Sequence, residues 1–111
     1  MKNLKVSYLL DFYGKLFSEK QQEFLEMYFQ DDMSLSEIAE VTGITRQGVY
    51  DNIKRCEKEI LSLESKLNLM DSFIEMSSFL DMVETKLDGR TLSENDIAEI
   101  KTSVSKIRNL I

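Results

Sequence analysis

The order of apolar and polar residues along the chain predicts helices and no strands. Apolar side chains recur at steps of three and four residues, which places them on one face of a helix. The first such segment covers about residues 3 to 17, with Leu9, Phe12, Tyr13, Leu16 and Phe17 on the apolar face. The second covers about residues 19 to 30, with Phe24, Leu25, Tyr28 and Phe29 buried.

Polar residues mark where these helices begin. Ser18 with Gln21, and Ser34 with Glu37, have the spacing of capping boxes. Ser34 therefore starts a short helix over about residues 35 to 41, whose inward residues are Ile38, Ala39 and Val41. Gly43 lies in the following turn, where glycine accepts the positive φ that ends a helix. Thr45 is then the N-cap of the next helix.

From Val49 onward, apolar residues repeat in alternating steps of four and three. This seam comprises Val49, Ile53, Cys56, Ile60, Leu63, Leu67, Met70 and Ile74. A repeat of more than three heptads predicts a long helix, which either breaks near Met70-Asp71 or continues to about residue 88. The seam could be covered by the C-terminal helices of the same chain. We favour a homodimer through the seam, because one small chain has difficulty burying about five apolar stripes.

Two further stripes complete the chain. The first comprises Met76, Phe79, Leu80, Val83 and Leu87 and stops at Gly89; the second follows an N-cap at Ser93 and comprises Ile97, Ile100, Val104, Ile107 and Ile111. The predicted fold is all-α. A helix-turn-helix domain, residues 1–68, is joined by the long helix to a C-terminal helical hairpin, residues 69–111, which would serve oligomerisation or partner binding.

Composition argues against most kinds of catalysis. The 111 residues include no histidine and a single cysteine, Cys56. The commonest general base is therefore missing, and a zinc site of the usual Cys/His type is excluded. No Gly-rich phosphate loop is present, so we expect no enzyme activity, metal or cofactor. Cys56 lies on the apolar seam, which favours a small buried group over a redox sensor.

The chain also lacks the signs of a membrane or secreted protein. No stretch approaches the roughly 18 apolar residues of a membrane span. The apolar patch at the N-terminus is interrupted by Asp11 and no small-residue cleavage site follows it, which argues against a signal peptide. A single cysteine fits a reducing compartment, so we expect a cytoplasmic protein.

Residues 34–55, SLSEIAEVTGITRQGVYDNIKR, have the spacing of a helix-turn-helix. Such a motif needs a small residue where its two helices touch, a glycine in the turn and apolar residues on the inner face of the second helix. Ala39, Gly43, Ile44, Val49 and Ile53 meet these needs, and Ser34 caps the first helix of the motif. Thr42 and Asn52 stand where an apolar residue is more usual.

The outer face of the second helix carries the candidate DNA contacts. Arg46, Gln47, Tyr50 and Asp51 would read base edges, since Arg and Gln can form two hydrogen bonds with guanine or adenine. Thr45, Lys54, Arg55 and Lys58 would bind the phosphate backbone of double-stranded DNA. Helix pairs of this shape also serve as protein-binding modules, so the fold alone does not decide between the two.

The net charge of −6 is unusual for a DNA reader. Residues 45–60 carry four basic and three acidic side chains, a net charge of +1, so the acidity lies mostly outside the candidate recognition helix. With about four basic side chains for phosphates, the expected DNA affinity is modest and sensitive to salt.

The segment LLDFYGKLFSEKQQEFLEMYFQDDMSLSEIAEVTGITRQGVYDNIKRCEKEI resembles the YlxM family of small bacterial proteins, and the likeness covers residues 9 to about 67. The stretches DFYG, EKQ, SLSEIAE and TRQGVYDNIKR carry this resemblance. The same region is similar to the DNA-binding region 4 of bacterial sigma factors. The resemblance implies an all-helical protein, with Ser34 to Val41 as supporting helix and Thr45 to Lys58 as recognition helix. Gly48 stands where alanine is usual. A glycine there would allow either close approach of a DNA backbone or tight helix packing, and we favour packing.

Genes of that family commonly lie beside those for the signal recognition particle GTPase or its receptor. The resemblance therefore implies a DNA-binding regulator associated with the secretion pathway. The alternative is a protein adaptor, in which the hairpin or the seam binds RNA polymerase or the secretion GTPase and the helix-turn-helix is scaffold. RNA binding ranks lower, because no arginine-rich segment is present.

Overall fold

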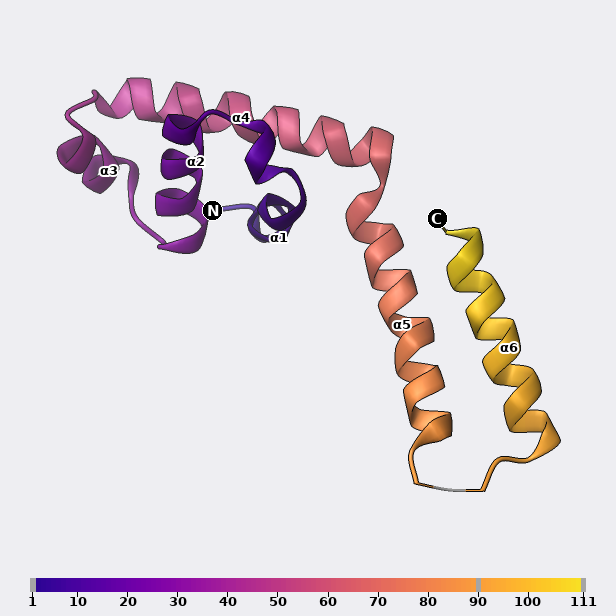
Figure 1. Ribbon diagram of the computed structural model, residues 1–111. Coiled ribbons are helices and arrows are strands. Elements are labelled where there is room, and N and C mark those ends of the chain that lie inside the picture. The colour runs from indigo at the N-terminus through magenta and orange to yellow at the C-terminus, as the bar shows by residue number, and fades with distance from the viewer. Residues whose placement is uncertain (1, 90, 111) are drawn as a thin grey trace. The chain divides into compact units, whose positions relative to one another are not determined.

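The structure is a computed structural model that describes residues 2–89 and 91–110, and every regular element within those ranges is helical (Figure 1). The elements are α1 (Leu4–Tyr13), a 3₁₀ turn η1 (Gly14–Leu16), α2 (Glu19–Leu25), a π-helical turn η2 (Glu26–Gln30), α3 (Leu35–Thr42), α4 (Arg46–Leu67), α5 (Leu69–Leu87) and α6 (Glu94–Asn109). The chain divides into two compact units, Met1–Asn68 and Leu69–Ile111.

Side-chain caps start the helices as the sequence predicts. Ser18, Ser34 and Ser93 each begin a complete capping box, in which the serine oxygen accepts the N–H of the residue three positions later and that residue's side chain accepts the serine N–H. The hydroxyl oxygen of Thr45 accepts the N–H of Gly48 at 3.1 Å. These bonds satisfy amide groups that a helix start otherwise leaves without a partner.

Left-handed residues end two of the helices. Gly43 has φ of +74° and stops α3, as expected. Asn68 has φ of +55° and stops α4, two residues before the predicted break at Met70-Asp71. Asparagine tolerates this conformation better than most side chains, so a single residue turns the chain without a proline. The first predicted helix is also shorter as an α-helix, because its last turn, from Gly14, is 3₁₀.

The core of the first unit lies between α4 and the three helices that precede it (Figure 1). Val49, Ile53, Cys56 and Ile60 are almost fully buried there, with α1, α2 and α3 packed on α4. This corrects both interpretations of the seam for these four residues. Helices of their own unit cover them, so neither the C-terminal hairpin nor a second copy does so.

Two apolar residues lie outside this core although they were expected inside it. Val41 is 69% exposed, and so is Leu16. In α3 it is Thr42, half-buried, that turns inward, because its hydroxyl donates to the carbonyl of Ile38 at 2.7 Å and so needs no partner elsewhere. Val41 then falls on the solvent side of this short helix.

Polar contacts between distant residues complete the first unit. Lys2 donates through Nζ to the carbonyls of Tyr28 and Met33, both at 2.7 Å, and so satisfies the end of η2. The hydroxyl of Tyr13 donates to Oε1 of Glu64 at 2.7 Å, and both side chains are buried. Neither contact follows from local spacing, since the partners are 26 to 51 residues apart.

The second unit is a hairpin of α5 and α6, which contact each other along their length. None of the 19 residues of α5, all of them described, is buried. In α6 the two buried residues are polar, Asp96 and Ser103. The predicted apolar stripes therefore do not form a closed core between the two helices. No helix in the described ranges is long and apolar enough to cross a membrane.

Candidate nucleic-acid interface

The helix-turn-helix is formed by α3, the turn at Gly43 and the first turns of α4. Its centre is a cluster of Phe24, Ile38, Val49 and Ile53, with Ala39 and Ile44 packed against it. Because Val49 and Ile53 point into this cluster, the opposite face of α4 is turned to solvent. The motif is therefore a packed unit with a free outer helix face.

All the predicted DNA contacts are exposed at the N-terminal end of α4. Arg46, Gln47, Tyr50 and Asp51 occupy its first two turns, and Tyr50 is 42% exposed. Lys54, Arg55 and Lys58 continue the same face along the following turns. At 100° per residue these seven side chains span about half of the helix circumference. We call this surface the outer face of α4.

Three of the cations on the outer face have no hydrogen-bond or ion-pair partner among the residues that the structure describes. Arg46, Arg55 and Lys58 form no hydrogen bond or ion pair in residues 2–89 and 91–110. Lys54 approaches Glu57 at 3.5 Å and lies 5.8 Å from the centre of the Tyr50 ring. An exposed pair at this distance is weak, so Lys54 can exchange Glu57 for a phosphate at little cost.

The polar residues of the outer face are partly preorganised. The amide group of Gln47 donates to Oδ1 of Asp51 at 2.9 Å, which holds the two side chains together on successive turns. The oxygen of Thr45 is occupied by its cap, but its hydroxyl hydrogen remains available to a phosphate oxygen. Asn52, where an apolar residue is more usual, donates to the carbonyl of Gly48 at 3.0 Å and is satisfied.

Gly48 lies tightly against the turn of the motif. A Cβ atom at this position would lie 3.0 Å from Cγ2 of Ile44 and 3.1 Å from Oγ1 of Thr45. Both atoms belong to the segment that enters α4. This contact supports the packing interpretation of Gly48 over close approach to a DNA backbone.

The structure adds two residues to the outer face. Glu57 and Leu61 join Tyr50, Lys54 and Lys58 in lining a shallow hollow. The sequence contained the signal for both, because residues 50, 54, 57 and 61 are separated by steps of three and four. Glu57 brings a negative charge beside the basic residues, which limits the attraction of this surface for phosphates.

Cys56 lies on the inner side of α4 and is 2% exposed. Burial raises the pKa of its thiol; the carboxylate of Glu59 adds to the rise and the guanidinium of Arg55 opposes it. The thiol is therefore protonated and shielded at neutral pH, as a small core residue is. In the described part of the chain, no three His, Cys, Asp or Glu side chains gather into a potential metal site.

Comparison with known proteins agrees with this geometry. The model of the family UPF0122, described as "Putative helix-turn-helix protein, YlxM / p13 like", matches residues 1–100. The chain belongs to this family. The match extends over α1 to α5 and the first turns of α6, so it includes the first helix of the hairpin.

Relatives in several bacteria resemble the chain over most of its length. A UPF0122 protein of Halalkalibacterium halodurans is 41% identical over 91% of this chain and 93% of that protein. One of Clostridium novyi is 39% identical over 97% and 93%, and one of Streptococcus gordonii 38% over 91% and 92%. This chain and these relatives are therefore of similar extent.

Proposed function

We propose that the protein is a cytoplasmic, DNA-binding regulator that docks the outer face of α4 in the major groove. The observation that carries this proposal is that Arg46, Arg55 and Lys58 lie on one exposed helix face of a packed helix-turn-helix and have no ion-pair partner in residues 2–89 and 91–110. A helix presented in this way fits the width of the groove. The resemblance to the YlxM family suggests that the regulated genes belong to the signal recognition particle pathway.

The residues of the outer face divide into two roles. Arg46, Gln47, Tyr50 and Asp51 would contact base edges, because they are at the N-terminal end of the helix, which enters a groove most deeply. Thr45, Lys54, Arg55 and Lys58 would contact phosphates. Asp51 accepts a hydrogen bond from Gln47, so the Gln47 amide keeps one N–H and its oxygen for a base.

Charge sets the expected strength of binding. The first unit has nine lysine and arginine residues against twelve aspartate and glutamate residues, so attraction to DNA is confined to the outer face. Three or four neutralised phosphates give a slope of about −3 in a plot of log K against log salt. Specific binding would therefore depend on the base contacts more than on charge.

The test is to titrate labelled duplex DNA from upstream of the protein's own operon, and a random duplex, across a salt series. Arg46→Ala should weaken binding to the preferred site by about 1–3 kcal/mol and leave the random duplex less affected. Lys54→Ala should weaken both duplexes alike and make the slope shallower by about 1. Lys20→Ala, which removes an exposed charge from α2, is the matched control. Equal binding by wild type and all three variants would exclude this function.

A second candidate is a protein adaptor, with the helix-turn-helix as scaffold. It is favoured by the net charge of only +1 over residues 45–60 and by the exposed apolar residues of the hairpin. RNA polymerase and the secretion GTPase are the partners to test first. An adaptor would retain such a partner at high salt and after nuclease treatment, and would lose it when residues 70–111 are removed. Loss on nuclease treatment would instead indicate nucleic acid.

A further inference from the structure

The hairpin of α5 and α6 carries two apolar stripes with the spacing of a coiled coil. Steps of four and three connect Leu69, Phe73, Met76, Leu80, Val83 and Leu87 in α5, and steps of three and four connect Ile97, Ile100, Val104 and Ile107 in α6. Much of this surface faces solvent. Phe73 is 53% exposed, Leu80 49% and Leu87 54%, while Ile97 and Val104 are 42% and 44% exposed.

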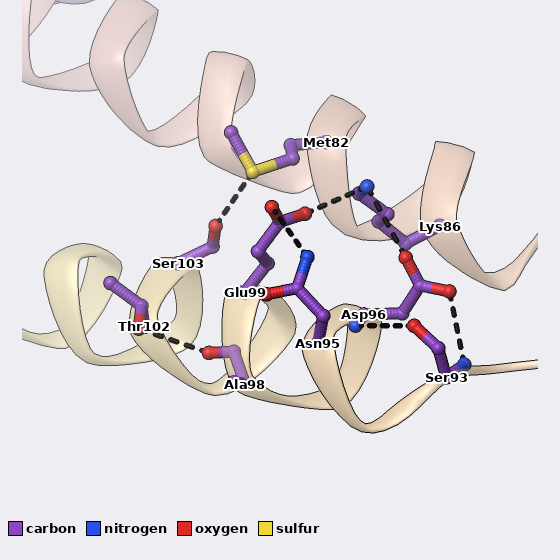
Figure 2. A network of polar contacts seen from close by, with 9 residues as sticks. All are labelled: Met82, Lys86, Ser93, Asn95, Asp96, Ala98, Glu99, Thr102 and Ser103. Carbon is purple, nitrogen blue, oxygen red and sulfur yellow. Dashed lines mark hydrogen bonds and ion pairs between the residues drawn. The ribbon is translucent and has the colours of Figure 1, made fainter.

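Polar side chains, together with Met82 and Phe79, make contacts between the two helices along a different line of residues (Figure 2). Nζ of Lys86 lies 2.7 Å from Glu99 and 3.3 Å from Asp96, and these carboxylates raise the pKa of the lysine. The hydroxyl of Ser103 donates to the sulfur of Met82 at 3.1 Å. Further along the pair, Lys106 lies over the ring of Phe79.

Both apolar stripes lie on one face of the hairpin. On each helix the apolar stripe lies about 100° around the helix axis from the line of contacts with the other helix. Viewed from the N-terminus of each helix, this rotation has the same direction. Because α5 and α6 run in opposite directions, equal rotations bring the two stripes to the same side. The network of Figure 2 therefore lies toward one side of the hairpin and the apolar stripes toward the other, the apolar face, where Leu80, Leu87, Ile97 and Val104 stay exposed and Met76, Val83, Ile100 and Ile107 are half-buried.

The outer edges of the apolar face differ in charge: that of α5 is acidic, and that of α6 carries two basic residues with Glu94 one heptad before the first of them. Glu84 follows Val83 on the outer edge of α5, while Lys101 follows Ile100 and Arg108 follows Ile107 on that of α6. All three are exposed, and within residues 2–89 and 91–110 they form no ion pair. Charged residues that flank the apolar stripe of a heptad repeat commonly form ion pairs with residues of the facing helix.

The contacts between α5 and α6 also determine where these charged residues lie along the helix axes. Three contacts give the register of the two helices: Lys86–Glu99, Met82–Ser103 and Phe79–Lys106. From one contact to the next, the residue number falls by four and then three in α5 and rises by four and then three in α6. Glu84 is therefore level with Lys101, although the two residues lie on opposite outer edges of the hairpin.

We propose that a second copy of this chain covers the apolar face, so that two hairpins form an antiparallel four-helix bundle. A twofold axis parallel to the helices packs α5 against α6 of the partner subunit. Rotation about this axis does not change the position of any residue along the helix axes. Glu84 then meets Lys101 of the partner subunit, and the symmetric pair forms at the other edge. Two hairpins packed in this way provide the four helices that a closed bundle needs.

The edge charges select this arrangement over the other twofold one. An axis perpendicular to the helices would set each helix against its own copy. The acidic edge of α5, with Asp81 and Glu84, would then face itself, whereas the edge of α6 carries Glu94 as well as Lys101 and Arg108, so it is the α5 edge that disfavours this arrangement. Like charges opposed across a helix interface are unfavourable. This dimer is independent of DNA binding, because none of its contacts involves α4.

The test uses the full-length chain and measures its mass by sedimentation velocity from about 1 to 100 µM. The wild type should be a dimer. Glu84→Lys and Lys101→Glu should each raise the dimer dissociation constant by about tenfold, because each replaces two symmetric attractions by repulsions. The double variant, Glu84→Lys with Lys101→Glu, should restore the wild-type value. Glu75→Lys is the matched control, because Glu75 is exposed and has no ion pair in the described residues.

Circular dichroism spectra of all variants should match that of the wild type, since the substituted side chains are exposed. A wild-type monomer at 100 µM would overturn the proposal, and the apolar face would then belong to a different protein. A dimer that Glu84→Lys weakens no more than Glu75→Lys does, or that the double variant fails to restore, would overturn it as well. Tighter association of Glu84→Lys would point to the arrangement with α5 against its own copy.

Discussion

At the scale of single residues, Gly43 and Gly48 illustrate two different needs for glycine in the same motif. Gly43 has a positive φ and an open surrounding, whereas Gly48 is helical and crowded by Ile44 and Thr45. The first is required by backbone conformation and the second by the space between the turn and α4. Both fix the angle at which α4 leaves the turn, and so the direction of its outer face.

The conformational need at Gly43 can be measured. Gly43→Ala should lower the free energy of unfolding by about 1–2 kcal/mol, because a Cβ atom disfavours the left-handed region. Gly14→Ala is the matched control: φ there is −55° and a Cβ would meet no atom within 4 Å. That substitution should stabilise the protein by about 0.4–1 kcal/mol through the unfolded chain. Urea unfolding of the two variants measures both effects, and equal destabilisation would contradict this account.

At the scale of elements, the capping boxes define where the helices of the motif begin. The Ser34 box fixes the start of α3, in which the serine oxygen accepts the Glu37 N–H at 3.1 Å. Ser34→Ala should therefore cost about 1 kcal/mol of unfolding free energy. Ser36→Ala, at an exposed position two residues into the same helix, should change stability by less than about 0.5 kcal/mol. Thermal or urea unfolding checks the pair, and a cost at Ser36 as large as at Ser34 would argue against the cap.

The elements also show which features a sequence predicts well. Caps, the Gly43 turn and the apolar periodicity depend on residues three or four positions apart, so the all-helical fold and the inward residues Ile38, Val49 and Ile53 followed from spacing. The cover of the α4 seam did not, because the heptad pattern is the same whether α1 to α3 or another chain fills it. The exposed Val41 was missed for another reason: Thr42 turns inward in its place because its hydroxyl bonds the Ile38 carbonyl, and apolar spacing does not indicate such a bond.

The candidate site was predictable to a similar degree. The exposure of the outer face follows from helical spacing once the inner residues are known. The pairing of Gln47 with Asp51, the contact of Lys54 with Glu57 and the hollow that includes Leu61 depend on side-chain conformations, which spacing does not determine. Contacts such as Tyr13 with Glu64 join residues 51 positions apart and had no local signal.

At the scale of the whole molecule, the net charge of −6 and a DNA-binding role are compatible. The acidic residues would repel DNA from most of the surface, while Arg46, Arg55 and Lys58 on the outer face of α4 have no ion-pair partner in the described part of the chain. Under the proposed function, this distribution of charge would restrict DNA to one orientation. Two copies joined through their hairpins would double the phosphate contacts, and the dependence of affinity on salt would become correspondingly steeper.

The most direct test of the central claim is an NMR titration of the isotope-labelled full-length chain with duplex DNA from upstream of its operon. The amide resonances of residues 45–58 should shift, with the largest changes at Arg46, Gln47 and Tyr50, and higher salt should reverse the shifts. Resonances of α6 should stay in place. Shifts confined to the hairpin, or none at low salt, would contradict DNA recognition by the outer face of α4.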